Sequence, residues 1–140
     1  TTTNTAQYYI KENSTSWGNY SNSSITLVRG KYNISPNLSS STWVSFNKNT
    51  ENYVTNFITE TNKSMLLTTG ASENTNKMNI YDLAGNEYEW TLEKNSNTDN
   101  SCSGRGGSHY STGFDYPVSH RYDSPTTNRG NSIGLRVSLY

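Results

Sequence analysis

The sequence predicts one α+β domain of 140 residues that is rich in short strands and loops. Its apolar residues occur in short alternating runs, which are typical of strands rather than long helices. Ser, Thr and Asn make up well over a third of the chain and indicate many turns. Only 30% of the residues are apolar, but three Trp and eleven Tyr are among them. We therefore expect aromatic side chains to supply much of the core.

The first part of the chain predicts one hairpin after an irregular start. Residues 1–24 contain isolated aromatic residues among polar ones, which indicates an irregular arm or a long loop. Residues 25–28 predict a short strand that ends at Gly30. Residues 31–34 are its expected hairpin partner.

The middle of the chain predicts two further extended segments and a short element between them. Residues 43–46 alternate large apolar and small polar side chains. Thr50 is placed to cap a short helix, although a strand through residues 54–58 fits nearly as well. Residues 65–67 predict a buried strand that is followed by a turn, and residues 71–78 a polar connection. The apolar face of the helix would comprise Tyr53, Val54, Phe57 and Ile58.

The last part of the chain has the clearest strand pattern. Residues 79–93 predict a strand, a Gly-Asn turn and a second strand around a tryptophan. Residues 95–104 predict a polar loop, and residues 105–108 begin another extended segment. Residues 111–132 predict a long loop with scattered aromatic residues. Residues 133–139 alternate and predict a final strand.

Charge and cysteine content exclude several classes of function. Eleven basic and eleven acidic residues cancel and form no blocks, so we expect no nucleic-acid partner. A neutral partner such as a glycan or a protein is a better match. Cys102 is the only cysteine, which excludes an internal disulfide and a cysteine-based zinc cluster. No apolar run approaches the length of a membrane span, so we expect no membrane insertion.

Three segments occur in a fixed order: NIYDLAGNEYEW, then RGGS, then IGLRVSLY at the end of the sequence. Together they resemble the formylglycine-generating-enzyme family, also called the sulfatase-modifying-factor family. The resemblance is strongest over residues 79–140. It implies a C-type-lectin-like fold of the formylglycine-generating-enzyme type, with residues 1–140 as a single domain.

The residue types in these segments have physical reasons. Gly85 permits a positive backbone φ in its turn, and Trp90 offers a large side chain to the core. The glycine pair at 106–107 allows a neighbouring backbone to approach closely. We expect Arg105 and Arg136 to place their guanidinium groups against carboxylates or carbonyls.

The resemblance also implies a calcium ion, which sits on the corresponding turn in family enzymes. Hard oxygen ligands are those that calcium prefers. The matching ligands would be the side chains of Asp82 and Glu89 and the carbonyls of Gly85 and Glu87.

The residues that the family needs for catalysis do not match, so we expect no enzyme activity. The family's copper-binding cysteine pair aligns with Ser111 and Tyr116, and Cys102 lies on the other side of RGGS. A related iron-dependent group uses a His-x-x-x-His-x-Glu cluster, whereas His109 and His120 are far apart in this sequence. We therefore expect neither copper nor iron.

The segment after RGGS resembles non-catalytic family members, the variable proteins of diversity-generating retroelements. In those phage and bacterial proteins this segment is diversified to change the ligand. Its Tyr, Ser and Asn content also suits a binding surface, since Tyr gives contact area at low entropic cost. The expected partner is a protein or glycan on a host or neighbouring cell, bound by an extracellular domain on a phage virion or bacterial surface. The candidate ligand contacts are His109, Ser111, Phe114, Asp115, Tyr116, His120, Tyr122, Asp123 and Asn128.

Tyr116 and Tyr122 fit a core position as well as an exposed one.

Two other interpretations of the function stay open. A structural fibre or decoration protein would pack residues 1–24 and 35–42 against neighbouring copies, which leaves a homo-oligomer open. A diverged formylglycine-generating-type enzyme would need a deep pocket with perturbed titratable groups, and it is the weakest of the three functions.

Overall fold

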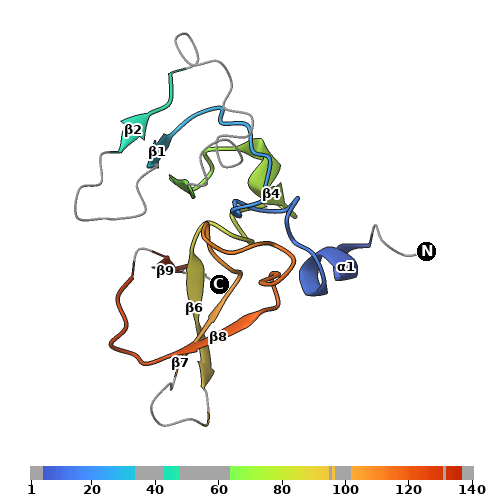
Figure 1. Cartoon of the computed structure of the whole chain (residues 1–140), viewed down its shortest axis with the longest axis vertical. Helices are drawn as coiled ribbons and strands as arrows, with labels where there is room; N and C mark the ends of the chain where they lie inside the picture. Colours follow the sequence, from blue (N-terminus) through green and yellow to red (C-terminus); the bar gives the residue numbers. More distant parts are fainter. Residues whose placement is uncertain are drawn as a thin grey trace.

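The protein is built from three small β-sheets and short helical segments (Figure 1). This arrangement agrees with the predicted strand-rich α+β class. Within the described residues, no helix is long and apolar enough to cross a membrane. The element expected at residues 50–58 lies outside the described part. The computed structural model describes residues 5–33, 43–47, 64–94, 96, 102–130 and 132–136.

The N-terminal segment is packed into the domain as a short helix and a long loop, so the expected long loop is confirmed and the alternative of an irregular arm is wrong. Helix α1 (Ala6–Lys11) begins after Thr5, whose hydroxyl accepts a hydrogen bond from the backbone N–H of Tyr8. The chain beyond the helix is irregular, yet Trp17 and Tyr20 are buried. The rings of Trp17 and Tyr9 stack 5.5 Å apart. Aromatic packing thus holds a loop in place where no regular ladder does.

The first sheet joins strands that are far apart in the sequence. Strand β1 (Lys31–Asn33) lies between β2 (Val44–Ser45) and β3 (Leu66–Leu67), and both pairings are antiparallel. The buried strand predicted at residues 65–67 is confirmed by β3. The hairpin predicted between residues 25–28 and 31–34 is wrong, because β1 pairs with the two later strands instead.

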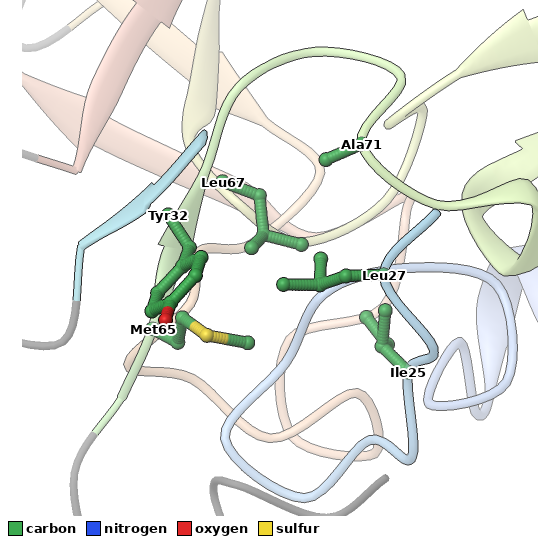
Figure 2. Close-up of a cluster of buried hydrophobic side chains, with 6 residues drawn as sticks. All are labelled: Ile25, Leu27, Tyr32, Met65, Leu67 and Ala71. Atoms are coloured by element: carbon green, nitrogen blue, oxygen red, sulfur yellow. The ribbon is translucent and has the colours of Figure 1, made fainter. Parts of the chain in front are cut away.

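Residues 25–28 form no strand, because side chains satisfy the backbone of Thr26 and the Val28 N–H donates to the Ala71 carbonyl. Ser72 Oγ donates to the Thr26 carbonyl at 2.6 Å, and Asn74 Oδ1 accepts from the Thr26 N–H at 3.1 Å. Alternate side chains of the segment still point inward, as the pattern predicted. They complete a buried cluster (Figure 2) of Ile25, Leu27, Tyr32, Met65, Leu67 and Ala71.

The predicted polar connection at residues 71–78 contains two short elements. A 3₁₀ turn (Glu73–Thr75) is capped by Ser72 and leads into β4 (Asn76–Lys77). Strand β4 pairs antiparallel with β5 (Ile80–Tyr81). The strand expected at the start of residues 79–93 is therefore β5, which belongs to a different sheet from the strand after the turn.

The third sheet carries the C-terminal half, in the order β8-β7-β6-β9. Strand β6 (Tyr88–Lys94) pairs antiparallel with β7 (Cys102–Arg105) and parallel with β9 (Ile133–Leu135). Strand β8 (Arg121–Ser124) pairs antiparallel with β7. The loops predicted at residues 95–104 and 111–132 are therefore too long, because β7 and β8 interrupt them. Trp90, expected in the core, is only half-buried on β6.

Close backbone crossings between distant segments explain two of the glycines in the motifs. Gly85 has a φ of +66°, and a Cβ there would lie 2.4 Å from the Asn19 carbonyl oxygen. A Cβ on Gly107 would lie 2.6 Å from the Tyr116 carbonyl oxygen. Both contacts are with backbone, so neither can be relieved by a side-chain movement. The positive φ expected at Gly85 and the close approach expected at Gly107 are both confirmed.

Asn86 joins four segments through a buried network of hydrogen bonds. Its side-chain amide accepts from the Leu67 N–H at 2.9 Å and donates to the Leu67 carbonyl at 2.9 Å, as a paired strand residue would. The same Oδ1 accepts from Asn19 Nδ2 at 3.0 Å. The Asn86 N–H donates to the Asn19 carbonyl, and its own carbonyl accepts from the His109 N–H. One amide thereby links the first sheet, the N-terminal loop and the turn before β6.

Replacing Asn86 with Ala should destabilise the fold strongly. The change leaves buried partners in Leu67 and Asn19 without hydrogen bonds, at about 1–3 kcal/mol for each group. Asn79 is a matched control because it is exposed and has nearly the same φ, 62° against 64°. We expect Asn86→Ala to lower the free energy of unfolding by roughly 2–4 kcal/mol more than Asn79→Ala does. Equal losses in chemical denaturation would contradict the linking role of the amide.

His109 should make stability depend on pH. Its ring Nδ1 lies 2.7 Å from the Asn86 carbonyl oxygen, which only accepts, so Nδ1 carries the proton of a neutral ring. Burial lowers the pKa of His109. The unfolded chain therefore takes up a proton first as the pH falls below about 6.5, and stability present above that pH is lost.

We expect the free energy of unfolding to fall between pH 7.5 and pH 5.5, with His109 contributing at most about 1.4 kcal/mol per pH unit. In the His109→Gln variant this contribution should disappear. Burial also lowers the pKa of His120 and raises that of Glu87, but both effects are common to the two proteins. Urea denaturation at several pH values measures the difference. Parallel pH profiles for the two proteins would show that His109 titrates alike in both states.

Candidate ligand-binding surface

One face of the third sheet brings two tyrosine rings together over a glycine. Gly104 lies opposite Trp90 on β6 and opposite Tyr122 on β8. Because residues that pair directly share a face, Tyr88, Trp90 and Tyr122 lie on the same side. The rings of Tyr88 and Tyr122 stack with centroids 4.9 Å apart. Since Gly104 has no side chain, rings from two strands that are not neighbours can meet above it.

Two more rings extend this pair into a row. The His120 ring lies 6.4 Å from that of Tyr88, and the Tyr116 ring meets His120 edge-on at 4.7 Å. We call Tyr116, His120, Tyr88 and Tyr122 the aromatic row. Tyr88 is buried, whereas Tyr116 and Tyr122 each leave 37% of their surface exposed. The row therefore has a fixed inner ring and two outer rings that face solvent.

Hydroxyl groups border the inner part of the row. Tyr88 Oη lies 3.5 Å from Ser111 Oγ, which lies 3.1 Å from Ser108 Oγ. The Ser111 carbonyl is held by the N–H and hydroxyl of Ser21, both at 2.9 Å. Burial raises the pKa of Tyr88, so its hydroxyl stays neutral at ordinary pH. These groups can donate and accept hydrogen bonds without bringing charge to the surface.

Four charged side chains of the sheet pair with one another on its other face. Glu93 contacts Arg105 at 2.7 Å and Arg121 at 3.3 Å, and Arg121 contacts Asp123 at 2.9 Å. Arg105 also donates to the Ser119 carbonyl. The expected contacts of Arg105 with a carboxylate and a carbonyl are confirmed. Because these charges are internally compensated, the surface suits a neutral ligand better than a strongly charged one.

The structure distributes the predicted ligand contacts among three settings. Tyr116, His120 and Tyr122 form the row, and Ser111 borders it. Phe114 is 65% exposed, and the exposed Asp115 accepts a hydrogen bond from Thr112 Oγ1 at 2.6 Å. The remaining two lie on β8 and in the turn after it: Asp123, which pairs with Arg121 on the face away from the aromatic rings, and Asn128, which donates to Ser124 Oγ at 2.7 Å.

His109 is the exception, because the structure buries it instead of exposing it. Only 2% of its surface is accessible, and its ring lies against Tyr110 at 4.0 Å. In the sequence His109 follows RGGS in a polar segment. Nothing in that segment indicates that its ring nitrogen would form a hydrogen bond with the Asn86 carbonyl. His109 is thus part of the scaffold beneath the surface.

Tyr88 is the residue of the candidate surface that sequence reasoning missed. Its alternation with Trp90 indicated one face of a strand, but the sequence gives no register between strands. The pairing of Gly104 with Tyr122 places the outer ring above Tyr88, and only the folded sheet shows that pairing. The one signal in the sequence was Gly104, a glycine between two segments that contain aromatic residues, because a glycine there allows rings from both segments to meet.

The acidic residues of the predicted calcium set lie around a small cavity. This polar cavity of about 70 Å³ is lined in part by Asp82, Glu87, Glu89 and Arg136. Both Glu89 oxygens accept from Arg136 Nε, at 2.7 and 2.8 Å. Arg136 also donates to the Asp82 carbonyl at 3.1 Å, as expected for this arginine. Glu89 thus faces a guanidinium, and the set as arranged does not fit a calcium ion unless Arg136 moves. Calcium binding by Asp82, Gly85, Glu87 and Glu89 stays a prediction.

The positions that align with the family's cysteine pair both lie at the aromatic row. Ser111 borders the row, and Tyr116 is its outermost ring. Cys102 is half-buried on β7, in the strand that precedes RGGS. The surface therefore occupies the place where the resemblance puts the reacting groups of family enzymes, with a hydroxyl and a phenol instead of two thiols.

Comparison with known families gives one match that spans most of the chain. The family described as the sulfatase-modifying factor enzyme 1-like domain matches residues 17–139. The match begins in the buried loop that contains Trp17, which the motifs of residues 79–140 did not include. Neither the curated proteins nor the solved structures contain a significant match. The chain belongs to the sulfatase-modifying-factor family, whose formylglycine-generating enzymes its three motifs resemble.

Proposed function

We propose that this chain is a non-catalytic member of its family that binds a protein or glycan ligand through the aromatic row. Its fold would be the C-type-lectin-like fold that membership implies. The observation that carries the proposal is the pair of outer rings, Tyr116 and Tyr122, each 37% exposed while joined to the buried Tyr88 through ring contacts. Rings that are fixed before binding lose little entropy when a ligand stacks on them.

The chemistry of the surface supports binding over catalysis. A thiol pair is replaced by Ser111 and Tyr116, and the Ser111 hydroxyl lies among other hydroxyls rather than beside a base. The His109 ring is turned toward the Asn86 carbonyl. A residual enzyme activity of a new kind remains the weaker alternative.

The setting that we propose is display on a phage virion or a bacterial surface, with a ligand on a host or neighbouring cell. A surface without net charge fits this role because it avoids non-specific attraction to nucleic acid and anionic lipid. A structural fibre or decoration protein is the second candidate. It would need the aromatic row to be covered by another copy.

Binding to cells should depend on the outer rings of the row. We expect fluorescently labelled protein to bind some strains in a panel of intact bacteria. Tyr122→Ala and Tyr116→Ala should each weaken this binding at least about tenfold, since central aromatic contacts often contribute 2 kcal/mol or more. Trp43→Ala is the matched control, because Trp43 is 39% exposed beside a different sheet. Flow cytometry measures the effect. Equal binding by all the variants would place the ligand elsewhere, and binding to no strain would favour the structural candidate.

If the surface is diversified, sibling copies should differ at exposed positions and agree at the scaffold. We expect changes at Tyr116, Tyr122 and Asp123, but not at Gly113, where a Cβ would lie 2.3 Å from the Thr15 backbone nitrogen. His109 should also stay constant because it supports the Asn86 carbonyl. Sequencing sibling copies measures this pattern. Changes spread evenly over the chain, or the absence of adenine-biased changes, would refute diversification.

A further inference from the structure

Strand β8 is an open edge of the third sheet. Its four residues pair with β7 on one side, and among the described residues no strand pairs with it on the other side. Arg121, Tyr122 and Asp123 are all exposed. An edge strand has a row of backbone N–H and C=O groups that can pair with a further strand. Lysine, proline and bulges often block such edges, and β8 itself contains none of them.

The side chains of β8 are complementary to a second copy of the same strand. Antiparallel pairing about a twofold axis at Tyr122 would place Arg121 of each copy opposite Asp123 of the other. Opposite residues in such a pair have their Cβ atoms about 4.5–5.5 Å apart, within reach of an ion pair. The two Tyr122 residues would face each other on the opposite side of the sheet. Pairing of this kind is isologous, so it closes as a dimer and does not propagate.

We propose that two copies of this chain dimerise by antiparallel pairing of their β8 strands. The two four-stranded sheets then form one continuous sheet, with an ion-pair face and an aromatic face. The two aromatic rows meet end to end at Tyr122, so the dimer presents a single surface with two equivalent halves. The pairing itself does not depend on ligand binding. The consequence for binding rests on the proposed function, because two linked sites bind a repetitive cell surface more tightly than one.

The first test is the mass of the wild-type protein in solution. Sedimentation over a range of micromolar concentrations should give a mass near twice that of the 15.7 kDa chain. A monomer at every concentration overturns the proposal. Hydrogen exchange on the same samples should show slower exchange for the β8 peptide as concentration rises. A dimer without that protection would place the interface elsewhere and also overturns it.

Two charge reversals then test the register. Arg121→Glu makes the edge wholly acidic and Asp123→Arg makes it wholly basic, so each variant alone should dimerise at least about tenfold more weakly. An equimolar mixture should restore dimers, because each acidic edge then meets a basic one. The control is Arg29→Glu, which reverses one charge of the exposed Arg29–Glu73 pair away from this sheet and should leave dimerisation unchanged. Single variants that dimerise like wild type contradict the pairing.

Cell binding separates this proposal from the proposed function. If Arg121→Glu is monomeric and binds bacteria more weakly than wild type but still measurably, both proposals hold. If the wild type is monomeric but its binding requires Tyr122, only the dimer fails. If the wild type dimerises through β8 and no variant of the aromatic row affects binding, only the ligand surface fails.

Discussion

The whole structure depends on the buried amide of Asn86. Three small sheets with few helices leave this chain little continuous core, so separate clusters must be joined by polar contacts. The Asn86 side chain forms two hydrogen bonds with the Leu67 backbone, as a neighbouring strand residue would. Its oxygen also accepts a hydrogen bond from the Asn19 side chain. Both side-chain atoms of Asn86 are bonded, whereas the buried Asn19 Oδ1 has no hydrogen-bond partner among the described residues, which costs part of the stability that the network supplies. Its positive φ of 64° also turns the chain into β6, so the network fixes where the third sheet begins.

The aromatic row follows from that starting point. Tyr88 is buried at the start of β6. Because Gly104 of β7 has no side chain, the Tyr122 ring of β8 can extend across β7 and stack on Tyr88. The loop between β7 and β8 then adds Tyr116 and His120. The backbone of this loop is fixed from beneath by contacts of Gly107 and Gly113 with the N-terminal segment and with its own turn. A rigid backbone thus carries side chains that the core does not need.

The sequence predicted the scaffold better than the surface. Positive φ at Gly85, close packing at Gly107 and the carboxylate partners of Arg105 and Arg136 could be predicted because each depends on local chemistry and a family motif. The register between strands could not be predicted. The residues of β7 and β8 are mostly polar and show no apolar alternation, so the sequence predicts loops there. His109 looked exposed because a polar segment surrounds it, whereas its burial comes from Asn86, far away in sequence. The partner of β1 was missed for a similar reason: side chains of Ser72 and Asn74 satisfy the nearer segment.

Neutrality connects the scaffold with the proposed role. Arg105, Glu93, Arg121 and Asp123 form a chain of alternating charges on one face, so these four charges compensate one another on the side away from the aromatic row. Arg136 likewise compensates the charge of Glu89, with which it forms an ion pair. Exposed ion pairs of this kind add little to stability, so their main effect is on what approaches the surface. Rings and hydroxyls are then left to select the ligand by shape and hydrogen bonding, and substitutions among them need not disturb the paired charges on the other face of the sheet.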